Sequence, residues 1–474
     1  MTRRPYHTHH RRKLWILLAL SLPCLWYGYQ YFTFNPQKII DNSELKDRNF
    51  NVKVEEITTP QSNIKAYFVE EKTNPIVSMS FVFKGCGYAY DPQGKSGLAE
   101  FSSAMFTEGA GDMDAASFKE HLENIAAEIG YSVDEDDFSG SFMSLKENLS
   151  QSVDMLRKTL YEPRLDEEDM HRTKRQTLQA IDHLQENPSN RLKEAFKHEL
   201  YGNHPYARNA LGIKKDVQSF NASDIRNFST SCLTKDRLFV GIAGDLSSQE
   251  AVSLLDEVFA DLPEKASTPD IKDVAADFSF RSIDIEDDTL PQILTMIAAP
   301  SVPRLHKDFY PLYIANYIIG GAGLNSRINE AAREKEGLTY GAYTSMSVAD
   351  KLPHFSGGFS TTPQNFERMK EIFISEWKKM GEKGISAQEL SSAKNYLQNS
   401  YNLRFADITT LSAMLAEIQK EDLGIDFLQK RNRYIGKVTL ERVNSAAKEF
   451  FANDKIIMVN MGKIKSERNI KDDK

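Results

Sequence analysis

The stretch DFSGSF at residues 137–142 returns as HFSGGF at residues 354–359. Each copy has the pattern of a strand, and each is followed by two amphipathic helices. The second helix opens with LDEE (165–168) after the first copy and with ISAQE (385–389) after the second. A strand–helix–helix order alone can recur by chance, but the shared FSG block favours duplication. A repeat this long indicates two domains of one type rather than a solenoid.

The segments around these blocks predict the same architecture in both halves. Strand patterns and helical spacing follow each other in a similar order, with runs of β-branched and aromatic residues in the strands. The sequence predicts an α+β fold of two tandem homologous domains, each a mostly antiparallel sheet packed against helices. The expected strands are 64–70, 76–84, 138–145, 238–243 and 293–299, and the expected helices are 96–108, 114–129, 149–160, 166–186, 248–259, 309–319 and 326–335.

Domain boundaries follow from composition. Residues 263–278 (PEKASTPDIKDVAADF) are polar and broken by prolines, as interdomain linkers are. We expect an N-terminal domain at 53–262, a C-terminal domain at 279–468 and a charged tail at 469–474. The 474 residues carry 41% hydrophobic and 27% charged side chains, which is typical of a globular protein. A net charge of -8 without a basic stripe argues against nucleic acid as a partner.

The first 34 residues have the pattern of an export signal. A basic head ending at Lys13 precedes an uncharged run from Leu14 to Phe34. Aromatic residues stand where a cleavable signal has small residues, so a retained membrane anchor is favoured over cleavage. Cys24 suggests a lipoprotein, but Pro23 directly before it fits that class poorly. We expect residues 1–34 to anchor the protein and residues 35–52 to form a tether.

Cysteine usage leaves one question open. Besides Cys24, the chain contains only Cys86 and Cys232, and no C-x-x-C pair. In an oxidising compartment these two could form one disulfide, but two buried free thiols fit the sequence equally well.

Several blocks in order resemble a known family. From about residue 50 to 470 the chain resembles the pitrilysin and insulinase family of zinc peptidases. Within that family it is most similar to the short bacterial two-domain members, which also resemble the mitochondrial processing peptidase. The blocks are GYAYDP (87–92), GKSGLA (94–99), TEG (107–109), ENP (186–188), YGNHPY (201–206) and GLTY (337–340).

The resemblance implies a zinc site that this chain has lost. Active members carry His-x-x-Glu-His after Gly-Leu-Ala, because imidazoles at i and i+4 share one helical face and the Glu activates a metal-bound water. Here Glu100, Ser103 and Ala104 occupy those positions, and Ala180 occupies that of the third ligand. We call these four the degenerate metal positions. One carboxylate does not replace three ligands, so we expect no metal, cofactor or catalytic residue in this chain.

Histidines elsewhere do not rebuild a metal site. The seven that follow the membrane segment include no pair at i, i+4 spacing. His204, in a His-Pro-Tyr turn, is interpreted as a structural hydrogen-bonding residue.

The C-terminal half keeps the family's substrate block. By resemblance, Arg333 and Tyr340 bind substrate: the Arg offers a planar fork and the Tyr a hydroxyl. The alternatives are that Arg333 makes a surface ion pair and that Tyr340 packs in the core. Arg327 is interpreted as structural. Residues 320–323 correspond to a flexible glycine-rich loop of the family and lack the Gly-Lys-Ser/Thr of a phosphate loop.

Three hypotheses follow. The leading one is a non-catalytic subunit that binds peptides along a strand edge and completes the chamber of a zinc-bearing homologous peptidase, in the bacterial inner membrane or periplasm. The second is a membrane-anchored scaffold or assembly protein with an inactive peptidase fold. The third, a hydrolase with another centre, lacks any Gly-x-Ser-x-Gly signature.

Overall fold

The structure is a computed structural model that describes residues 52–401, 405, 407–451 and 455–464. These residues all belong to one compact unit. The expected membrane segment, nearly all of the tether and the charged tail lie outside them. Among the helices described, none combines the length and the apolar character needed to cross a bilayer.

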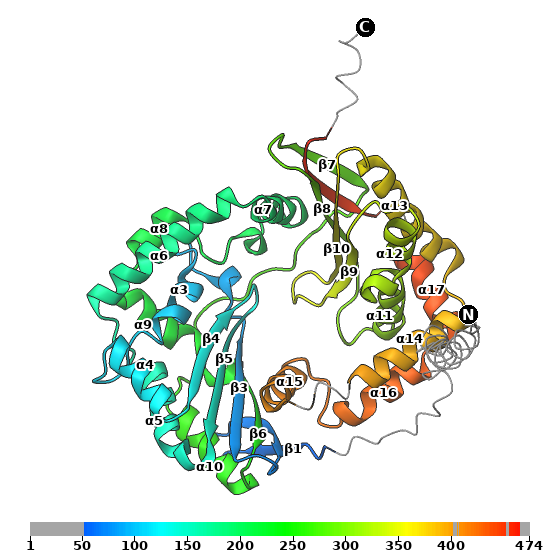
Figure 1. The fold of residues 1–474 in the computed structure, drawn as a ribbon. Helices are drawn as coiled ribbons and strands as arrows, with labels where there is room; N and C mark the ends of the chain where they lie inside the picture. Colours follow the sequence, from blue (N-terminus) through cyan, green and yellow to red (C-terminus); the bar gives the residue numbers. More distant parts are fainter. Residues whose placement is uncertain (1–51, 402–404, 406, 452–454, 465–474) are drawn as a thin grey trace, which may run out of the picture. The chain divides into compact units, whose positions relative to one another are not determined.

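The first half of the chain builds a six-stranded sheet (Figure 1) in the order β1-β2-β6-β3-β5-β4. Neighbouring strands are antiparallel except β2 and β6, which are parallel. Alternating and continuous apolar runs explain why these segments pair in a half-buried sheet. The strands are β1 (Glu55–Thr58), β2 (Lys65–Glu70), β3 (Ile76–Lys84), β4 (Glu128–Val133), β5 (Asp137–Leu145) and β6 (Leu238–Gly244).

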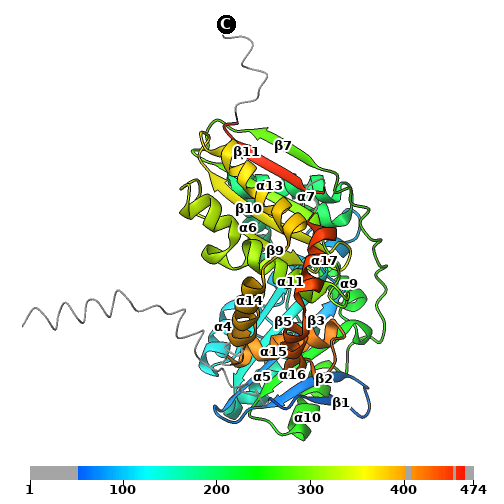
Figure 2. The same cartoon turned by 90° about the vertical axis from the view of Figure 1, so that its right-hand side faces the viewer.

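The second half repeats this topology with one strand fewer. Its sheet has the order β7-β11-β8-β10-β9, and only β7 and β11, which run side by side in Figure 2, are parallel. Strand for strand, this order matches β2-β6-β3-β5-β4. The predicted α+β fold with two domains is therefore confirmed, and the two sheets share one strand order. The strands are β7 (Arg281–Glu286), β8 (Ile293–Pro300), β9 (Ala342–Ser347), β10 (His354–Thr361) and β11 (Ile457–Gly462).

The repeated FSG block has a packing reason. It lies at equivalent places in β5 and β10. A Cβ on Gly140 would stand 2.0 Å from the ring of Phe81, and one on Gly357 would stand 2.6 Å from the carbonyl oxygen of Tyr343. Both strands therefore require glycine where a neighbouring strand or its side chain approaches closely.

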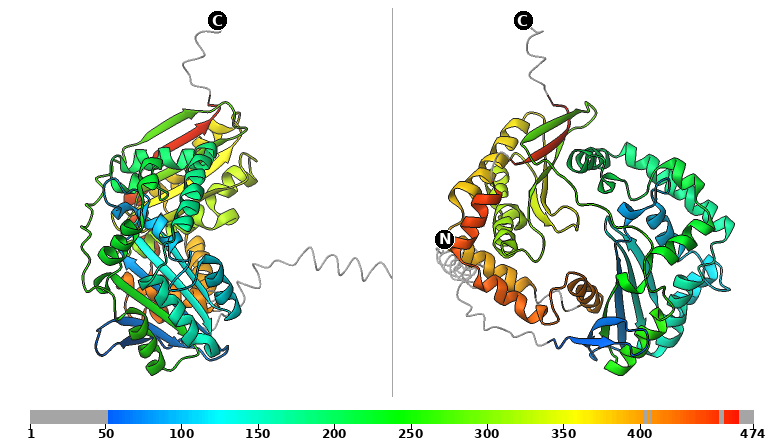
Figure 3. Two further views of the ribbon diagram at one scale, coloured as in Figure 1. Left: turned by 90° about the vertical axis from the view of Figure 1, so that its left-hand side faces the viewer. Right: turned by 180° about the vertical axis from the view of Figure 1, so that it is seen from behind.

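Both halves contain many helices, and most of them cover one face of their own half's sheet (Figure 3). In the first half they are α3 (Leu98–Met105), α4 (Ala115–Asn124), α5 (Leu149–Tyr161), α6 (Glu167–Glu186), α7 (Pro188–Tyr201), α8 (Lys214–Ser219), α9 (Ala222–Cys232) and α10 (Ser248–Phe259). In the second half they are α11 (Phe309–Asn316), α12 (Arg327–Asn329), α13 (Phe366–Lys383), α14 (Ala387–Asn399), α15 (Ile408–Lys420), α16 (Phe427–Lys437) and α17 (Leu440–Phe450).

Short helical turns complete the description. The π-turns are η5 (Tyr317–Gly321) and η7 (Glu330–Glu334), and the 3₁₀ turns are η1 (Tyr88–Tyr90), η2 (Lys146–Asn148), η3 (Pro205–Ala207), η4 (Lys235–Arg237) and η6 (Gly323–Asn325).

Two helices are exchanged between the halves. Helix α7 of the first half packs on β8 and β11 of the second sheet, where Leu192 and Phe196 join a core with Val459. Helix α15 of the second half packs on β2, β3 and β6 of the first sheet (Figure 1). A Cβ on Gly241 in β6 would lie 2.1 Å from the carbonyl oxygen of Ser412, so α15 approaches this sheet closely.

Two predicted helices are wrong in extent. The helix expected at 114–129 ends at Asn124, because Ala126 has a φ of 50° and β4 begins at Glu128. The helix expected at 326–335 is a short α12 followed by η7. Asn187-Pro188 ends α6 as expected, and α7 starts at that proline.

Candidate functional site

The helix that would carry zinc keeps its supporting frame. The buried carboxylate of Asp91 accepts hydrogen bonds from the backbone N–H groups of Gly97, Leu98 and Ala99 at 2.7, 3.1 and 2.9 Å. It therefore caps the first turn of α3. Gly97 has a φ of 92°, and a Cβ there would lie 2.5 Å from the carbonyl oxygen of Leu211. The GLA block thus positions α3 through its backbone, without a metal.

The degenerate metal positions do not suit zinc. Glu100 is half-buried, which raises the pKa of its carboxyl group, and it makes no ion pair with any described residue. Ser103 donates its hydroxyl to the carbonyl oxygen of Glu100 at 2.7 Å. Ala104 on α3 and Ala180 on α6 offer no ligand atom. The described part of the chain contains no group of three or more His, Cys, Asp or Glu that could hold a metal ion.

Acidic side chains near this helix are already paired. Glu108 contacts Arg172 of α6 at 2.5 Å and Lys119 at 3.1 Å, and Arg172 also pairs with Asp169. His204 is structural, as interpreted from the sequence. Its Nδ1 accepts from the backbone of Tyr206, and its Nε2 lies 2.8 Å from the carbonyl oxygen of Lys272.

Tyr340 and Arg333 differ in their exposure to solvent. The side chain of Tyr340 is 84% exposed, so it does not pack in the core. Arg333, in the π-turn η7, is half-buried and makes no ion pair or side-chain hydrogen bond with a described residue. Both structural alternatives for these residues are excluded. Their role in substrate binding stays a prediction.

Arg327 has the structural role expected of it. Its guanidinium group donates to both carboxylate oxygens of Glu389, at 2.6 and 2.8 Å, and to the carbonyl oxygen of Gly384. Burial alone would raise the pKa of Glu389, but the bonds from Arg327 and Ser386 lower it to about 2. This bidentate pair joins α12 to α14.

The glycine-rich segment, which the resemblance implied to be a flexible loop, lies in the π-turn η5 and the 3₁₀ turn η6. Gly320 and Gly321 lie in η5, and a Cβ on Gly320 would stand 2.4 Å from the hydroxyl of Thr344. The turn therefore packs directly on β9, which follows Tyr340 in the chain. π-Turns of this kind are rare in proteins, and many of those that occur lie at functional sites.

Sequence reasoning missed a contact between the two halves. The carboxylate of Asp136, in the turn between β4 and β5, accepts from the hydroxyl of Tyr206 and from the backbone N–H of Asp350 at 2.9 Å. Asp350 also pairs with Lys84 at 2.9 Å. Burial raises the pKa of Asp136 to about 7. The turns after β4 and β9 are equivalent in the repeat, but no motif in either marks this pairing.

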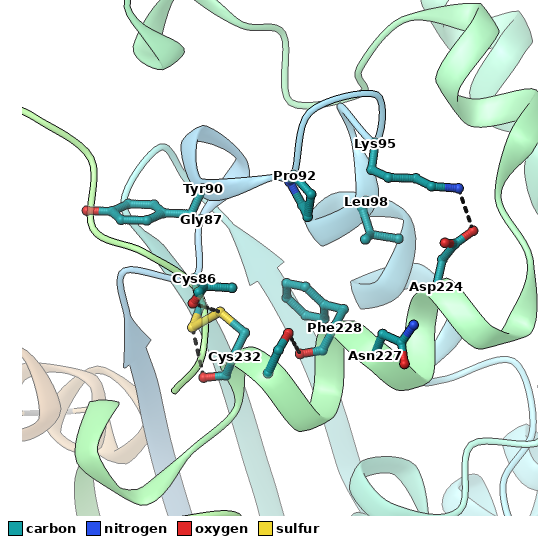
Figure 4. Close-up of a pocket in the computed structure, with 12 residues that line it drawn as sticks. Cys86, Gly87, Tyr90, Pro92, Lys95, Leu98, Asp224, Asn227, Phe228 and Cys232 are labelled. Atoms are coloured by element: carbon teal, nitrogen blue, oxygen red, sulfur yellow. Dashed lines mark hydrogen bonds and ion pairs between the residues drawn. A yellow bond between two sulfur atoms is a disulfide. The ribbon is translucent and has the colours of Figure 1, made fainter. Parts of the chain in front are cut away.

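A disulfide joins Cys86, just after β3, to Cys232 at the end of α9. Their Cα atoms are 5.8 Å apart, within the range that a disulfide spans. A pocket of about 210 Å³ lies beside the bond (Figure 4). Its wall includes an ion pair of 2.8 Å between Lys95 and Asp224. Because Cys86 and Cys232 are joined in the structure, the alternative of two free thiols is excluded.

Comparisons with known proteins agree with this architecture. Residues 67–213 match the family model described as insulinase (peptidase family M16), and residues 219–397 match the model described as peptidase M16 inactive domain. Residues 67–213 contain α3, and residues 219–397 contain the block with Arg333 and Tyr340.

Relatives with curated names are distant in sequence but similar in length. A Helicobacter pylori protein named non-peptidase homolog YmxG is 25% identical over 394 residues, which cover 82% of this chain and 89% of the relative. The mitochondrial-processing peptidase subunit beta of Neurospora crassa is 22% identical over 379 residues, which cover 76% and 77%.

Solved structures share the fold. The peptidase M16 inactive domain from Pseudomonas fluorescens superposes with a TM-score of 0.81 at 23% identity, over 87% of this chain and 98% of that one. A protease from Helicobacter pylori gives a TM-score of 0.78 at 17% identity, over 86% and 99%.

Proposed function

Since this chain belongs to the insulinase family, peptidase M16, and its described residues form no group that could hold a metal ion, we propose that it is a non-catalytic, substrate-binding subunit of a heterodimeric zinc metallopeptidase. The zinc and the general base belong to a homologous partner subunit that carries His-x-x-Glu-His. This chain contributes binding surface for peptides, which the partner cleaves.

The observation that carries the proposal is the contrast between the two halves. The side chains at the degenerate metal positions cannot bind zinc or activate a water molecule, although Asp91 still caps α3 and holds it in place. In the second half, Tyr340 is exposed, and Arg333 is half-buried without an ion pair to any described residue. An Arg without a carboxylate partner and an exposed Tyr suit the carbonyl oxygens and amides of a peptide backbone.

An open strand edge beside α3 supports peptide binding. Strand β4 is at the edge of the first sheet, and α3 packs beside it. The turn after β4 closes with a hydrogen bond from Asp134 N–H to the carbonyl of Asp137. By the alternation of antiparallel pairs, the backbone groups of Ile129, Tyr131 and Val133 then point away from β5. An extended peptide can add to such an edge as a further strand.

The partner and the location are part of the same proposal. One relative is named as a subunit, which is consistent with function in an assembly. The disulfide between Cys86 and Cys232 suits an oxidising compartment. Together with the basic head and uncharged run at residues 1–34, it supports a periplasmic body held at the inner membrane of a bacterium.

The test is reconstitution with a homologous subunit that carries His-x-x-Glu-His. We expect the partner alone to cleave a fluorogenic peptide poorly and the complex to cleave it well. The double variant Arg333→Ala/Tyr340→Phe should still assemble but raise KM. A matched control, Arg433→Ala/Tyr396→Phe, changes exposed residues of the same types on α16 and α14 and should have no effect.

Two outcomes contradict the proposal. One is cleavage by the partner at an equal rate without this chain, and the other is an unchanged KM in the double variant. A complex that forms without any effect on cleavage favours the alternative, a membrane-anchored scaffold with an inactive peptidase fold.

A further inference from the structure

A second pocket lies apart from the degenerate metal positions. It has a volume of about 480 Å³ and is formed by α11, the end of β9, α15 and α16. Its size lies within the range of ligand pockets in proteins. Six apolar or aromatic side chains of its lining are only half-buried, so a ligand can touch them. These residues are Tyr310, Tyr313, Met346, Val348, Met414 and Leu423.

A cation with open donor groups stands at this pocket. The guanidinium group of Arg304 lies 4.3 Å from the ring centre of Phe309 and 5.5 Å from that of Phe427, and both rings line the pocket. Arg304 is half-buried and makes no side-chain hydrogen bond or ion pair with a described residue, yet none of its nitrogen atoms is enclosed. A ligand can therefore reach these nitrogens, and the two rings hold the guanidinium plane in place.

A second guanidinium group adds positive charge to the lining. Arg431 of α16 is only 7% exposed, lies 3.9 Å from the ring centre of Tyr401 and donates to the carbonyl oxygen of Leu397 at 2.9 Å. No described carboxylate forms an ion pair with it. Burial lowers the pKa of Arg431, as expected of a cation removed from water. A buried cation without a counter-charge is costly, and a nearby anion would offset that cost.

The two carboxylates of the lining, in contrast, already have a cation. Glu417 lies 2.9 Å from the Nζ atom of Lys420, and Glu421 lies 3.7 Å from it. Lys420 also pairs with Asp137 of the first sheet at 2.8 Å. The acidic groups of the pocket are therefore paired and lie at the end of α15, whereas the cations before α11 and on α16 have no described carboxylate. This distribution of charge favours a ligand with a carboxylate group.

We propose that this pocket binds the C-terminal residue of the peptide held by this subunit, with a bulky apolar side chain on that residue; this specificity rests on the proposed function. The side chain packs among tyrosine and methionine residues. The terminal carboxylate accepts hydrogen bonds from the guanidinium group of Arg304, whose planar donors fit both carboxylate oxygens. A peptide with an amidated end fills the same space but brings no negative charge.

The pocket is within reach of the substrate block. Met346 follows Tyr340 by six residues, and six residues of chain span at most roughly 20 Å. A peptide of eight residues, with an extended length of about 28 Å, can therefore contact Tyr340 and place its last residue in the pocket.

The test uses the purified full chain and acetylated alanine octapeptides that differ only at the C-terminal end, measured by calorimetry. The last residue is Phe or Ala, and the terminus is a free carboxylate or an amide. We expect the Phe carboxylate peptide to bind at least about tenfold more tightly than its amide, because hydrogen bonds between charged groups are the stronger ones. It should also bind at least about tenfold more tightly than the Ala carboxylate peptide, because the Phe side chain is buried.

Four variants separate charge from shape. Arg304→Met keeps an apolar stem beside the rings and should abolish the ratio between carboxylate and amide, whereas Arg304→Lys keeps the charge and should retain a preference for the carboxylate. Met414→Trp fills the pocket from α15 and should abolish the ratio between Phe and Ala, whereas Ala413→Trp, on the exposed side of the same helix, should not. As a further control, Arg433→Met removes an exposed cation of α16 outside the pocket and should change neither ratio.

The outcomes distinguish this inference from the proposed function. Equal binding of the Phe carboxylate peptide and its amide, or an unchanged ratio in Arg304→Met, overturns the inference while leaving the proposed function intact. Decanoate binding as tightly as the Phe carboxylate peptide overturns the assignment to a peptide. Absence of binding by every peptide contradicts the proposed function instead.

Discussion

Reduction of the single disulfide of the folded body should destabilise the protein strongly. The bond joins residues separated by 146 positions, so in the unfolded chain it closes a very long loop. The loop-entropy relation for a cross-link of this length gives ~5 kcal/mol at 25 °C. Measured values for native disulfides commonly reach roughly 2–4 kcal/mol, because unfolded chains retain structure. We expect a loss within this span when Cys86 and Cys232 are reduced.

Urea denaturation with and without dithiothreitol measures this effect, with Cys24→Ser in every sample so that only one pairing is possible. The midpoint should fall on reduction. The slope m should rise, because an unfolded chain without the cross-link exposes more surface. Reduction truncates no side chain, so core packing is otherwise matched between the two samples.

Two results would refute this reasoning. Equal urea midpoints with and without dithiothreitol would show that constraining the unfolded state with this cross-link does not measurably raise the free energy of unfolding. A lower midpoint with an unchanged m would mean that the bond acts by holding the end of β3 against α9 in the native state instead.

Three further predictions concern charge and metal. The pKa of Asp136 is raised, so its protonated form adds to the free energy of unfolding; this contribution is complete below pH 4 and is lost as the pH rises through about 7. Asp136→Asn mimics the protonated acid, so it should remove about 2 kcal/mol of the difference in unfolding free energy between urea titrations at pH 5 and pH 8. The pKa of Glu389 is lowered, so its ionised form adds to the free energy of unfolding; this contribution is present above pH 5 and is lost as the pH falls toward 2. Glu389→Gln should therefore show a flatter acid denaturation curve by circular dichroism. The triple variant Glu100→His/Ala104→His/Ala180→Glu should bind stoichiometric zinc by elemental analysis, whereas the parent chain treated identically should bind none.

The duplicated architecture was predictable from sequence because its signal is local. The FSG block recurs since each copy needs glycine at one close contact, at Gly140 and at Gly357. The strand runs around it are β-branched and aromatic, so their positions were close to those observed. Strand β4 was not predicted, and the helix expected at 114–129 ran into it, because nothing local distinguishes Ala126, which adopts a positive φ, from the helical residues before it.

The exchange of α7 and α15 was not predictable from the pattern of their residues. An amphipathic pattern records that one face of a helix is buried, and it does not say which sheet covers that face. The loss of the metal ligands, in contrast, follows from the sequence alone, because the residue types at the degenerate metal positions decide it. The exposure of Tyr340, and the lack of an ion pair between Arg333 and any described residue, required coordinates.

The exchanged helices also bear on how the chain can be divided. If it were cut between residues 263 and 278, each fragment would carry a helix shaped for the other fragment's sheet and would leave an apolar face of its own sheet bare. Neither piece would then be a self-sufficient protein. Coexpressed, the two should recognise each other and reassemble, as in a split reporter.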